Sequence, residues 1–440
     1  MYRLDDIDMI NKNLSKIQDD ASKEYKTNNE PTLTDISYVY NSIKEYIKKN
    51  KKLVYGGFAQ NLLIHDKKPD ESFYKEIDGA YYNWPDLADI EFYSPDPIKD
   101  TIELVDYLHS KGFKNIQGKE GVHHETYKIF VNFLNYCDIS YVPPNIFEKI
   151  PYIEIQGIRC THPHFMLVDA YRVLTDPMTS YWRVDKSIKR FQKLLRYYPM
   201  DKINQEQYNK VEFNTMIPTK DLQFIRRKII HKSRLIVVGF YAYDYYMKKT
   251  DKQYMLNRYP YYEVISTDYI KDSKYISYIM KKKYNDRLIV KEYNPYFNFT
   301  DERTEFYLDD KLVLILYGNN KRCIVYRYSE NKTTYFGTFN LVYMYMLFAY
   351  YINMPYHKIY KILTSHMIYG RNKYLDTHNI TVVDKSPFQD FTIKCIGKPD
   401  ELTHDKMLNS KQAKFIYYPG MDKIKLYKND YFNNSGLKKI

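Results

Sequence analysis

The fragments LVYGGFAQNLL at 53–63 and ADIEFYS at 88–94 decide the expected fold of the first part of this chain. In the first fragment, apolar residues followed by Gly56-Gly57 predict a short strand, a tight turn and the start of a helix. The second predicts a strand that carries Asp89 and Glu91 two residues apart. Because side chains on a strand alternate between its faces, both carboxylates point to the same side, roughly 7 Å apart. We therefore expect a glycine turn beside a pair of carboxylates.

A third carboxylate, Asp138, lies in the apolar strand pattern YCDISYV at 136–142. An unpaired carboxylate is costly among apolar residues, and neighbouring strands lie about 4.8 Å apart, so we expect Asp138 beside Asp89 and Glu91. Carboxylates hold Mg²⁺ or Mn²⁺, and two such ions activate a 3′-hydroxyl and neutralise a pyrophosphate leaving group. The N–H groups of a glycine turn at a helix start attract phosphate.

Each of these signals is weak alone. A Gly-Gly pair is also typical of a simple strand–helix turn, and Asp89 with Glu91 is also typical of a solvated strand face. Their combination with Asp138 on a later strand favours nucleotidyl transfer. Asp89, Glu91 and Asp138 are then the expected metal-binding catalytic residues, and Gly56 and Gly57 the expected triphosphate cradle.

Composition points to a polyanionic partner. The chain has 440 residues, a formal net charge of +13 and 51 tyrosines. An AT-rich coding sequence explains most of the tyrosine, although tyrosines among lysines also suit single-stranded nucleic acid. Basic clusters at 48–52, 226–234 and 281–283 are candidate contacts to a nucleic-acid backbone, and each alone is also typical of a solvated surface.

The cysteines indicate an intracellular protein. None of the four cysteines has a C-x-x-C or zinc-site spacing, so we expect reduced, buried thiols at Cys137, Cys160, Cys323 and Cys395. The N-terminal residues lack a basic-then-apolar signal pattern, and no run of about 18 apolar residues occurs. We therefore expect no membrane span.

Local patterns predict several further elements of the first half. A helix begins near Thr34, capped by Thr34 or Asp35, with Ile36, Val39 and Ile43 on one face. A second helix runs from Asp96 to about residue 111, and residues 66–86 are expected to form a polar and aromatic loop. Strands are expected at 124–133 and 136–142, helices over most of 162–198, and a polar linker at 199–217.

The second half repeats the first. Residues 218–242 echo 31–59, and EVISTDYIKD at 263–272 echoes IEFYSPDPIKD at 90–100. The order of such matches favours an internal duplication over chance similarity. In the second copy Gly57 is expected to match Gly239. The expected replacements in the second copy are Val238 for Gly56, Tyr261 for Asp89, Glu263 for Glu91, and the segment Arg322, Cys323 and Ile324 for the region of Asp138.

The pattern of GGFAQNLLI, DIEFYSPDPI and CDISYVP resembles the nucleotidyltransferase superfamily. It resembles most the poly(A) polymerase catalytic subunits of large cytoplasmic DNA viruses, of the poxvirus and mimivirus-like kind, over roughly residues 34–365. The resemblance implies a catalytic copy followed by a degenerate one, with Asp89, Glu91 and Asp138 as the catalytic triad. Two departures are the long gap between Gly57 and Asp89, and Glu91 where aspartate is common.

The same resemblance implies a helical region that contacts the nucleotide. Here TSYWRVDKSIKRFQKLLRYY at 179–198 is the candidate. An ordinary amphipathic helix with a solvated basic face is the simpler interpretation for any one of its residues. The expected phosphate contacts are Lys186, Lys189 and Arg190, and the expected adenine-stacking residues are Tyr181 and Trp182.

The sequence therefore predicts an α/β (α+β) protein with two nucleotidyltransferase-like copies. The expected divisions are an extension at 1–33, the catalytic domain at 34–150, a helical contact region at 151–217, the degenerate copy at 218–365 and a basic extension at 366–440. The expected activity is template-independent addition of AMP from ATP to the 3′ end of viral mRNA. The alternatives are a CCA-adding or uridylyl enzyme, and a non-catalytic RNA-binding scaffold. The viral resemblance implies a homodimer in the host cytoplasm, in viral factories or packaged in virions.

Overall fold

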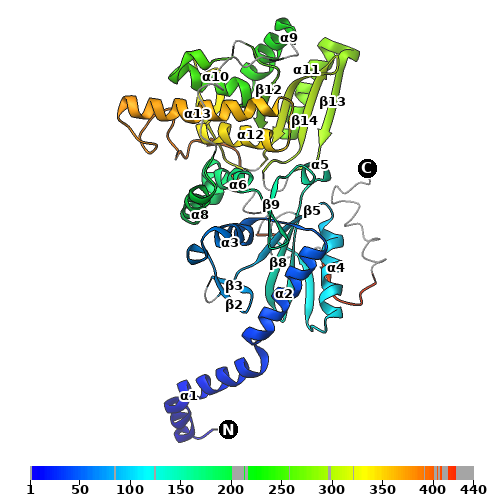
Figure 1. The fold of residues 1–440 in the computed structure, drawn as a ribbon, viewed down its shortest axis with the longest axis vertical. Helices are drawn as coiled ribbons and strands as arrows, with labels where there is room; N and C mark the ends of the chain where they lie inside the picture. The colour runs from blue at the N-terminus through cyan, green and yellow to red at the C-terminus, as the bar shows by residue number, and fades with distance from the viewer. Residues whose placement is uncertain are drawn as a thin grey trace.

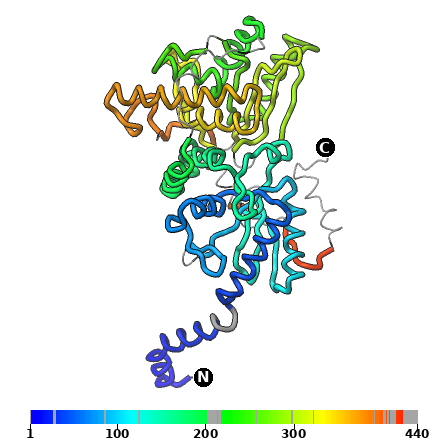
Figure 2. Tube along the Cα trace, in the orientation of Figure 1, coloured from blue at the N-terminus to red at the C-terminus, as the bar shows by residue number. Residues whose placement is uncertain are grey.

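The computed structural model shows two α/β units stacked along the long axis of the molecule, with a helix projecting from the first (Figure 1). The trace in Figure 2 shows that the blue and cyan part of the chain builds one unit, the green to orange part builds the other, and the red C-terminal segment returns to the first. The structure describes residues 2–83, 86–122, 125–200, 213, 217–256, 258–295, 299–320, 322–390, 392–400, 404, 407–408 and 415–422. Most of the linker expected at 199–217, and the end of the chain after 422, lie outside the described residues.

The first unit is built on an eight-stranded mixed sheet with the order β19-β6-β7-β8-β5-β1-β10-β9. The central strand β1 is antiparallel to β5 and parallel to β10, and β5 is parallel to β8. The strands are β1 (Leu53–Val54), β5 (Ile90–Ser94), β6 (Ile116–Glu120), β7 (Thr126–Val131), β8 (Leu134–Tyr141), β9 (Tyr152–Ile155), β10 (Ile158–Thr161) and β19 (Ile416–Tyr417).

The second sheet has the order β13-β14-β15-β12-β11-β17-β16-β18, and its strands from β13 to β16 repeat those from β6 to β9 in the first sheet, while β19 and β18 are added at opposite edges. Each neighbouring pair from β13 to β16 runs in the same relative direction as its counterpart in the first sheet. This agreement supports the internal duplication. The strands are β11 (Ile236–Val238), β12 (Tyr262–Ser266), β13 (Leu288–Tyr293), β14 (Arg303–Leu308), β15 (Lys311–Gly318), β16 (Ile324–Tyr328), β17 (Tyr335–Gly337) and β18 (Cys395–Ile396).

Strand register corrects two of the expected correspondences. Gly56 and Gly239 each begin a helix after the central strand, with φ of +63° and +62°, so Gly239 matches Gly56 rather than Gly57. Asp138 pairs with Glu91 across β5 and β8, and the corresponding partner of Glu263 is Ile315. The counterpart of Asp138 is therefore Ile315, and the match to residues 322–324 was wrong because those residues belong to the start of the next strand.

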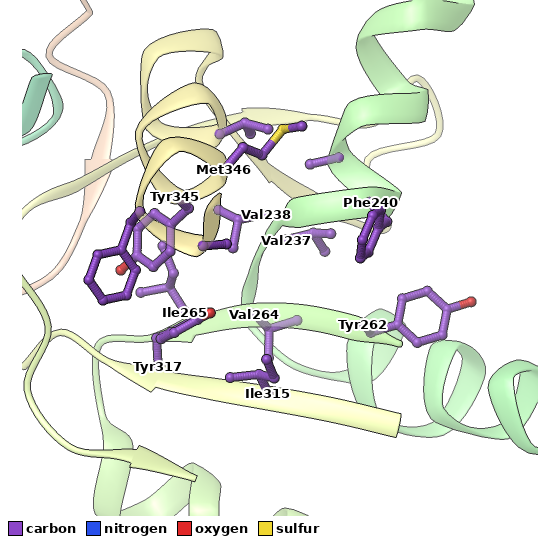
Figure 3. Packing of buried hydrophobic residues seen from close by; sticks show 14 of the residues in the cluster. Val237, Val238, Phe240, Tyr262, Val264, Ile265, Ile315, Tyr317, Tyr345 and Met346 are labelled. Carbon is purple, nitrogen blue, oxygen red and sulfur yellow. The ribbon is translucent and has the colours of Figure 1, made fainter. Parts of the chain in front are cut away.

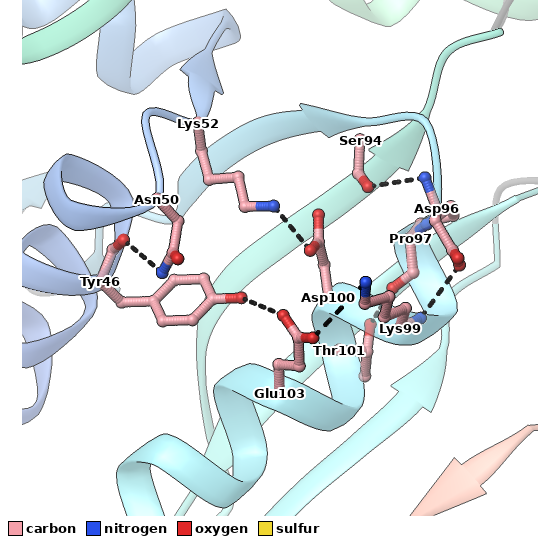
Figure 4. Close-up of polar contacts among 10 residues, drawn as sticks. All are labelled: Tyr46, Asn50, Lys52, Ser94, Asp96, Pro97, Lys99, Asp100, Thr101 and Glu103. Carbon is pink, nitrogen blue, oxygen red and sulfur yellow. Dashed lines mark hydrogen bonds and ion pairs between the residues drawn. The ribbon is translucent and has the colours of Figure 1, made fainter. Parts of the chain in front are cut away.

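The helices around the first sheet follow the predicted pattern closely. Thr32, not Thr34 or Asp35, caps α2, because its hydroxyl accepts from the Asp35 N–H while Asp35 accepts from the Thr32 N–H. Asp96 caps α4 as predicted, and Figure 4 shows its contacts beside the Lys52–Asp100 ion pair. The helices of this half are α1 (Leu4–Asn29), α2 (Leu33–Lys49), α3 (Gly56–Lys67), α4 (Pro97–Ser110), α5 (Pro144–Phe147), α6 (Pro163–Thr175), α7 (Pro177–Ser180) and α8 (Val184–Tyr197).

Two equivalent helices pack against each other between the units. Helix α6 follows β10, α12 follows β17, and the rings of Phe165 and Tyr351 meet edge to face with centroids 5.9 Å apart. A largely apolar interface of this kind favours a fixed relation between the copies. The helices of the second half are α9 (Thr219–Phe224), α10 (Gly239–Thr250), α11 (Tyr269–Tyr284), α12 (Phe339–Tyr351) and α13 (His357–His378). Helix α13 crosses residue 366, where the sequence places the start of the C-terminal extension.

Residues 66–86 form more than a loop, which corrects the expectation for this segment. They contain a small antiparallel sheet of β2 (Lys75–Ile77), β3 (Ala80–Asn83) and β4 (Asp86–Leu87). Asp78 and Gly79 both have positive φ and form a two-residue hairpin turn between β2 and β3. Tyr81 and Tyr82 are buried, so residues 66–86, which we call the insertion, pack on the first copy.

The C-terminal segment contacts both sheets. Strand β18 pairs with β16 at one edge of the second sheet, and β19 pairs with β6 at one edge of the first. Phe415 and Tyr417 are buried in the first core. Cys323 and Cys395 form a disulfide that joins the start of β16 to β18, so the expectation of four reduced thiols was wrong for this pair. Cys137 and Cys160 are buried free thiols, as predicted.

Candidate active site

The glycine turn places a carboxylate under the start of α3. Gly56 adopts a positive φ that glycine tolerates best, and a Cβ there would overlap the Glu91 carboxylate. The Gly57 N–H donates to Glu91 Oε2 at 2.6 Å. The Tyr55 N–H donates to the Glu91 carbonyl at 2.9 Å and fixes the turn to β5. Sequence and backbone therefore agree that position 56 must be glycine.

The three predicted carboxylates gather at one end of the first sheet. Glu91 lies on β5 directly beside Asp138 on the parallel strand β8, and Asp89 immediately precedes β5. Burial and the Asp138 charge raise the pKa of Glu91 to about 7 and that of Asp89 to about 6. Both pKa values are raised because the carboxylates are partly buried and lie close to other negative charges. A bound cation would relieve that repulsion.

Two residues that sequence reasoning missed surround Asp138. The Lys128 ammonium lies 2.8 Å from both carboxylate oxygens of Asp138, and the Asn135 amide donates to Oδ1 at 3.0 Å. Lys128 is the partner of Asp138 across β7 and β8 only because a register shift separates Ile129 from Phe130. An uninterrupted hairpin would pair Lys128 with Cys137, so the sequence pattern alone hid this contact.

The residues present fit a divalent metal site. The site has three carboxylates, the hard oxygen ligands that Mg²⁺ and Mn²⁺ prefer, and two of them have raised pKa values. Lys128 places a positive charge against the third carboxylate, as a metal ion would. Among the described residues, no group of three or more His, Cys, Asp or Glu side chains is assembled closely enough to hold a metal as it stands. Metal binding would therefore draw Asp138 away from Lys128.

Helix α8 brings an arginine to the glycine turn. Arg190 donates to the Tyr74 hydroxyl at 2.7 Å, and a Cβ on Gly57 would lie 2.8 Å from Arg190 Nη1. Tyr74 belongs to the insertion, and its backbone N–H donates to Asn61 of α3 at 3.0 Å. Residues 66–86, through Tyr74, therefore position Arg190, one of the predicted phosphate contacts, over the N-terminus of α3.

The other predicted contacts of residues 179–198 differ from one another. Lys186 lies near enough to Glu91 and Asp89 for their negative charges to favour its charged form. Burial, and then the positive charge of Arg190, oppose this and lower the pKa of Lys186. Lys189 instead pairs with Asp185 at 2.9 Å, with both side chains largely exposed. Tyr181 and Trp182 are 70% and 59% exposed and contact each other. The structure thus brings Arg190 and Lys186 to the site and leaves the other three at the surface.

The equivalent place in the second copy is packed rather than open. Glu263 accepts from the Tyr317 hydroxyl at 3.0 Å and from the Tyr360 hydroxyl. Tyr261 stands at the place of Asp89, and Ile315, at the place of Asp138, belongs to the buried apolar cluster that Figure 3 draws around β12. Of the three carboxylates, only the counterpart of Glu91 remains.

Comparisons with known proteins agree with this geometry. Residues 41–180 match the family model "Poly(A) polymerase catalytic subunit", and residues 192–437 match "APMV, Putative poly(A) polymerase, catalytic subunit, C-terminal". The chain belongs to the poly(A) polymerase catalytic subunit family. A relative from Acanthamoeba polyphaga mimivirus, named "Putative poly(A) polymerase catalytic subunit", is 30% identical over 95% of this chain and 78% of the relative.

More distant relatives and a solved structure point the same way. A protein of the same name from African swine fever virus (isolate Tick/Malawi/Lil 20-1/1983) is 28% identical over 43% of this chain and 38% of the relative. The crystal structure of the Megavirus polyadenylate synthase superposes with a TM-score of 0.76 at 28% identity, covering 100% of this chain and 91% of that one. The chain is therefore a viral-type poly(A) polymerase, a polynucleotide adenylyltransferase with the two-copy fold, and the scaffold and CCA-adding alternatives are not favoured.

The helices of the described residues do not meet what a membrane span requires. None of them combines the length and the apolar character that crossing a bilayer requires.

Proposed function

We propose that the first copy of this poly(A) polymerase carries the chemistry. It transfers AMP from ATP to the 3′ end of an RNA without a template and releases pyrophosphate, with Asp89, Glu91 and Asp138 as ligands for Mg²⁺ or Mn²⁺. One observation carries this proposal: the three carboxylates gather beside the glycine turn only in the first copy. At the equivalent places the second copy has Tyr261 and Ile315, which cannot bind a divalent ion.

The chain's own residues have separable tasks in this proposal. The bound ions supply charge neutralisation and activation of the attacking hydroxyl. The N-terminus of α3 presents backbone N–H groups, and Arg190 and Lys186 bring two cations to the same place, so the triphosphate is held here. Tyr74 holds the Arg190 guanidinium in position through the 2.7 Å hydrogen bond. Asn135 and Lys128 orient Asp138 until the metal binds.

The base is the least constrained part of the substrate. Tyr181 and Trp182 are exposed aromatic side chains at the start of α8, where either would stack on adenine if the helix end closes over the nucleotide. Lys189 is a weaker candidate for a phosphate contact than Arg190, because its ammonium pairs with Asp185 on the solvent side of the helix.

Primer extension tests the proposal. A short oligoadenylate RNA is incubated with Mg²⁺ or Mn²⁺ and each ribonucleoside triphosphate in turn, using the full chain and the Asp89→Asn and Asp138→Asn variants. We expect long products with ATP from the wild type and none from either variant. The matched control is Asp268→Asn, which removes a carboxylate at the start of α11 in the second copy and should extend normally. Products with UTP or CTP but not ATP would contradict the adenylate assignment.

Two further parts of the proposal concern where the chain acts and how it assembles. Relatives with the same name come from mimivirus and African swine fever virus, which supports a viral mRNA as the substrate. We propose that it acts on viral mRNA in the host cytoplasm, in viral factories or packaged in virions, and that it works as a homodimer. Light scattering of the purified chain at several concentrations tests the dimer, and a monomer at every concentration would contradict it.

A further inference from the structure

Helix α11 of the second copy has an exposed face on which tyrosines alternate with lysines. Tyr275 and Tyr278 are 42% and 64% exposed, which is unusual for residues of this size. Their spacing puts them on one side of the helix, and the lysines lie one turn before and after them. We call this the α11 face; it consists of Lys271, Lys274, Tyr275, Tyr278, Lys281 and Lys282, all exposed.

The duplication provides an internal comparison for this face. Helix α4 holds the same place in the first copy, since the N-cap residue of each helix lies two residues after an equivalent serine whose hydroxyl accepts from the N-cap N–H. Counting from those caps, Tyr275 and Tyr278 stand where α4 has Glu103 and Asp106. The acidic pair of α4 is engaged: the Tyr46 hydroxyl donates to Glu103 (Figure 4), and that of Tyr417 donates to Asp106.

The edge of the sheet beside α11 is also open. In the first copy, β19 covers the outer edge of β6, next to α4. In the second copy, β13 is the counterpart of β6 and ends its sheet, with no further strand beyond it among the described residues. Ile289 and Val290 of β13 are 41% and 39% exposed. The second copy therefore leaves this sheet edge uncovered, and α11 carries two exposed tyrosines where α4 carries an acidic pair.

We propose that the α11 face binds single-stranded RNA upstream of the 3′ end that is being extended; this rests on the poly(A) polymerase activity of the first copy. Lysines along a helix neutralise backbone phosphates, and exposed tyrosine rings stack on bases of any sequence. Figure 1 shows α11 at the end of the long axis opposite α1, far along the second unit. RNA held there stays tethered while its 3′ end is extended, which raises the effective concentration of the end at the site.

Nearby acidic groups do not cancel this charge. Asp272 is half-buried and accepts from the Ser266 hydroxyl, and Asp268 occupies the N-cap position before the first residue of the helix. Asp286 and Glu292 lie past the helix end and on β13, so the four lysines of the face remain in excess. A second copy of the same chain that met this face through its own α11 face is a poorer occupant, because the two sets of lysines would oppose each other.

RNA binding separates this proposal from the catalytic one. Affinity is measured by fluorescence anisotropy at several salt concentrations for oligoadenylates of about 5 and about 40 nucleotides, the shorter within the span of one binding site. All proteins carry Asp89→Asn, so binding is read without extension. The lysine variant replaces Lys271, Lys274, Lys281 and Lys282 by Gln, and the aromatic variant carries Tyr275→Gln and Tyr278→Gln. A charge-matched control replaces Lys12, Lys16, Lys332 and Lys385 by Gln. The unsubstituted chain has a formal net charge of +13, so Asp89→Asn raises it to +14, and the loss of four lysines takes both the lysine variant and this control to +10.

The long RNA should respond and the short one should not. For single strands each lost phosphate contact lowers the slope of log affinity against log salt by about 0.7, so the lysine variant should lose about 3 in slope on the long RNA. The aromatic variant should bind the long RNA about fivefold more weakly or worse. The control variant should behave as the wild type, and all proteins should bind the short RNA equally.

Three results would overturn the proposal. The first is an equal loss of long-RNA affinity in the control variant, which would mean that only net charge matters. The second is unchanged RNA affinity in both α11 variants, with or without a change in oligomeric state by light scattering. The third guards against misfolded variants: wild-type protein is photocrosslinked to long RNA with 4-thiouridine upstream of the 3′ end, and the absence of crosslinks to residues 269–284 contradicts the site.

Discussion

Replacing Glu91 by glutamine should stabilise the metal-free protein at neutral pH while abolishing its activity. In the folded chain, burial and Asp138 raise the pKa of Glu91 from 4.5 to about 7. A pKa raised by folding means that folding favours the protonated form, so stability is greatest at low pH and falls as the pH rises through about 7. Each pKa unit is worth about 1.4 kcal/mol, so the charged carboxylate costs about 3 kcal/mol above pH 7. Glutamine removes that charge and still accepts from the Gly57 N–H.

Thermal unfolding measures this effect. In EDTA near pH 8, Glu91→Gln should raise Tm by about 6–12 °C, from roughly 2–4 °C per kcal/mol for a unit of this size. Near pH 5 the carboxyl group of the folded wild type is already protonated, so the Tm difference between the variant and the wild type should become small. Mg²⁺ should stabilise the wild type by binding its carboxylates and so reduce the gap near pH 8.

The control is Glu263→Gln in the second copy. The pKa of Glu263 is also raised to about 7, first by burial, but tyrosine hydroxyls donate to it, and the nearby Glu305 carboxylate is paired with Arg303. Its effect on Tm should therefore be independent of Mg²⁺. If Glu91→Gln gave the same Tm change with and without Mg²⁺, the Glu91 carboxylate would not bind the ion. An equal Tm change near pH 5 and pH 8 would mean that folding does not raise the pKa of Glu91.

Three other perturbations follow from the same geometry. Gly56→Ala and Gly239→Ala should each cost about 1–2 kcal/mol for the left-handed backbone, plus displacement of the carboxylate beneath, but only Gly56→Ala should abolish extension below its Tm. Lys128→Met should lower the free energy of unfolding of the metal-free protein by about 2 kcal/mol. It should also tighten divalent metal binding, measured by calorimetry, because no ammonium then competes for Asp138; unchanged metal affinity would contradict the idea that Lys128 occupies the place of a metal charge. Deleting residues 415–440 removes two buried aromatic side chains, worth at least about 3 kcal/mol, and should make the first copy sensitive to limited proteolysis while the second copy stays resistant.

The sequence was sufficient for the outline of the site because two short-range rules governed it. The alternation of side chains on a strand set Asp89 and Glu91 on one face, and an apolar strand containing Asp138 had to lie in the same sheet. The duplication was also readable, since the serine and cap of α4 recur at α11. These features depend on local pattern and on adjacent strands, which a sequence displays directly.

The details that the sequence missed depend on irregularities and on distant contacts. A bulge after Ile129 brought Lys128 opposite Asp138, and no periodic pattern signals a bulge. The match of Gly57 to Gly239 followed the shared Gly-Phe letters, whereas the backbone matches glycines by positive φ. The hairpin at Asp78-Gly79 had a readable turn signal, yet the polar character of 66–86 concealed it. Arg190 and Tyr74 meet across 116 residues, a contact that only the folded chain reveals.

The two copies together separate what the fold needs from what the chemistry needs. Both keep a positive-φ glycine with a glutamate beneath it, at Gly56 with Glu91 and at Gly239 with Glu263, so this pair belongs to the strand–helix turn. Asp138 has become Ile315 in the second copy, and the remaining glutamate there is satisfied by tyrosine hydroxyls. In the second copy the nearby Glu305 is paired with Arg303, whereas in the first copy Asp89 and Asp138 both crowd Glu91, and a bound cation would relieve that repulsion. It follows that Mg²⁺ should alter the response to substitution at Glu91 and leave the response at Glu263 unaltered.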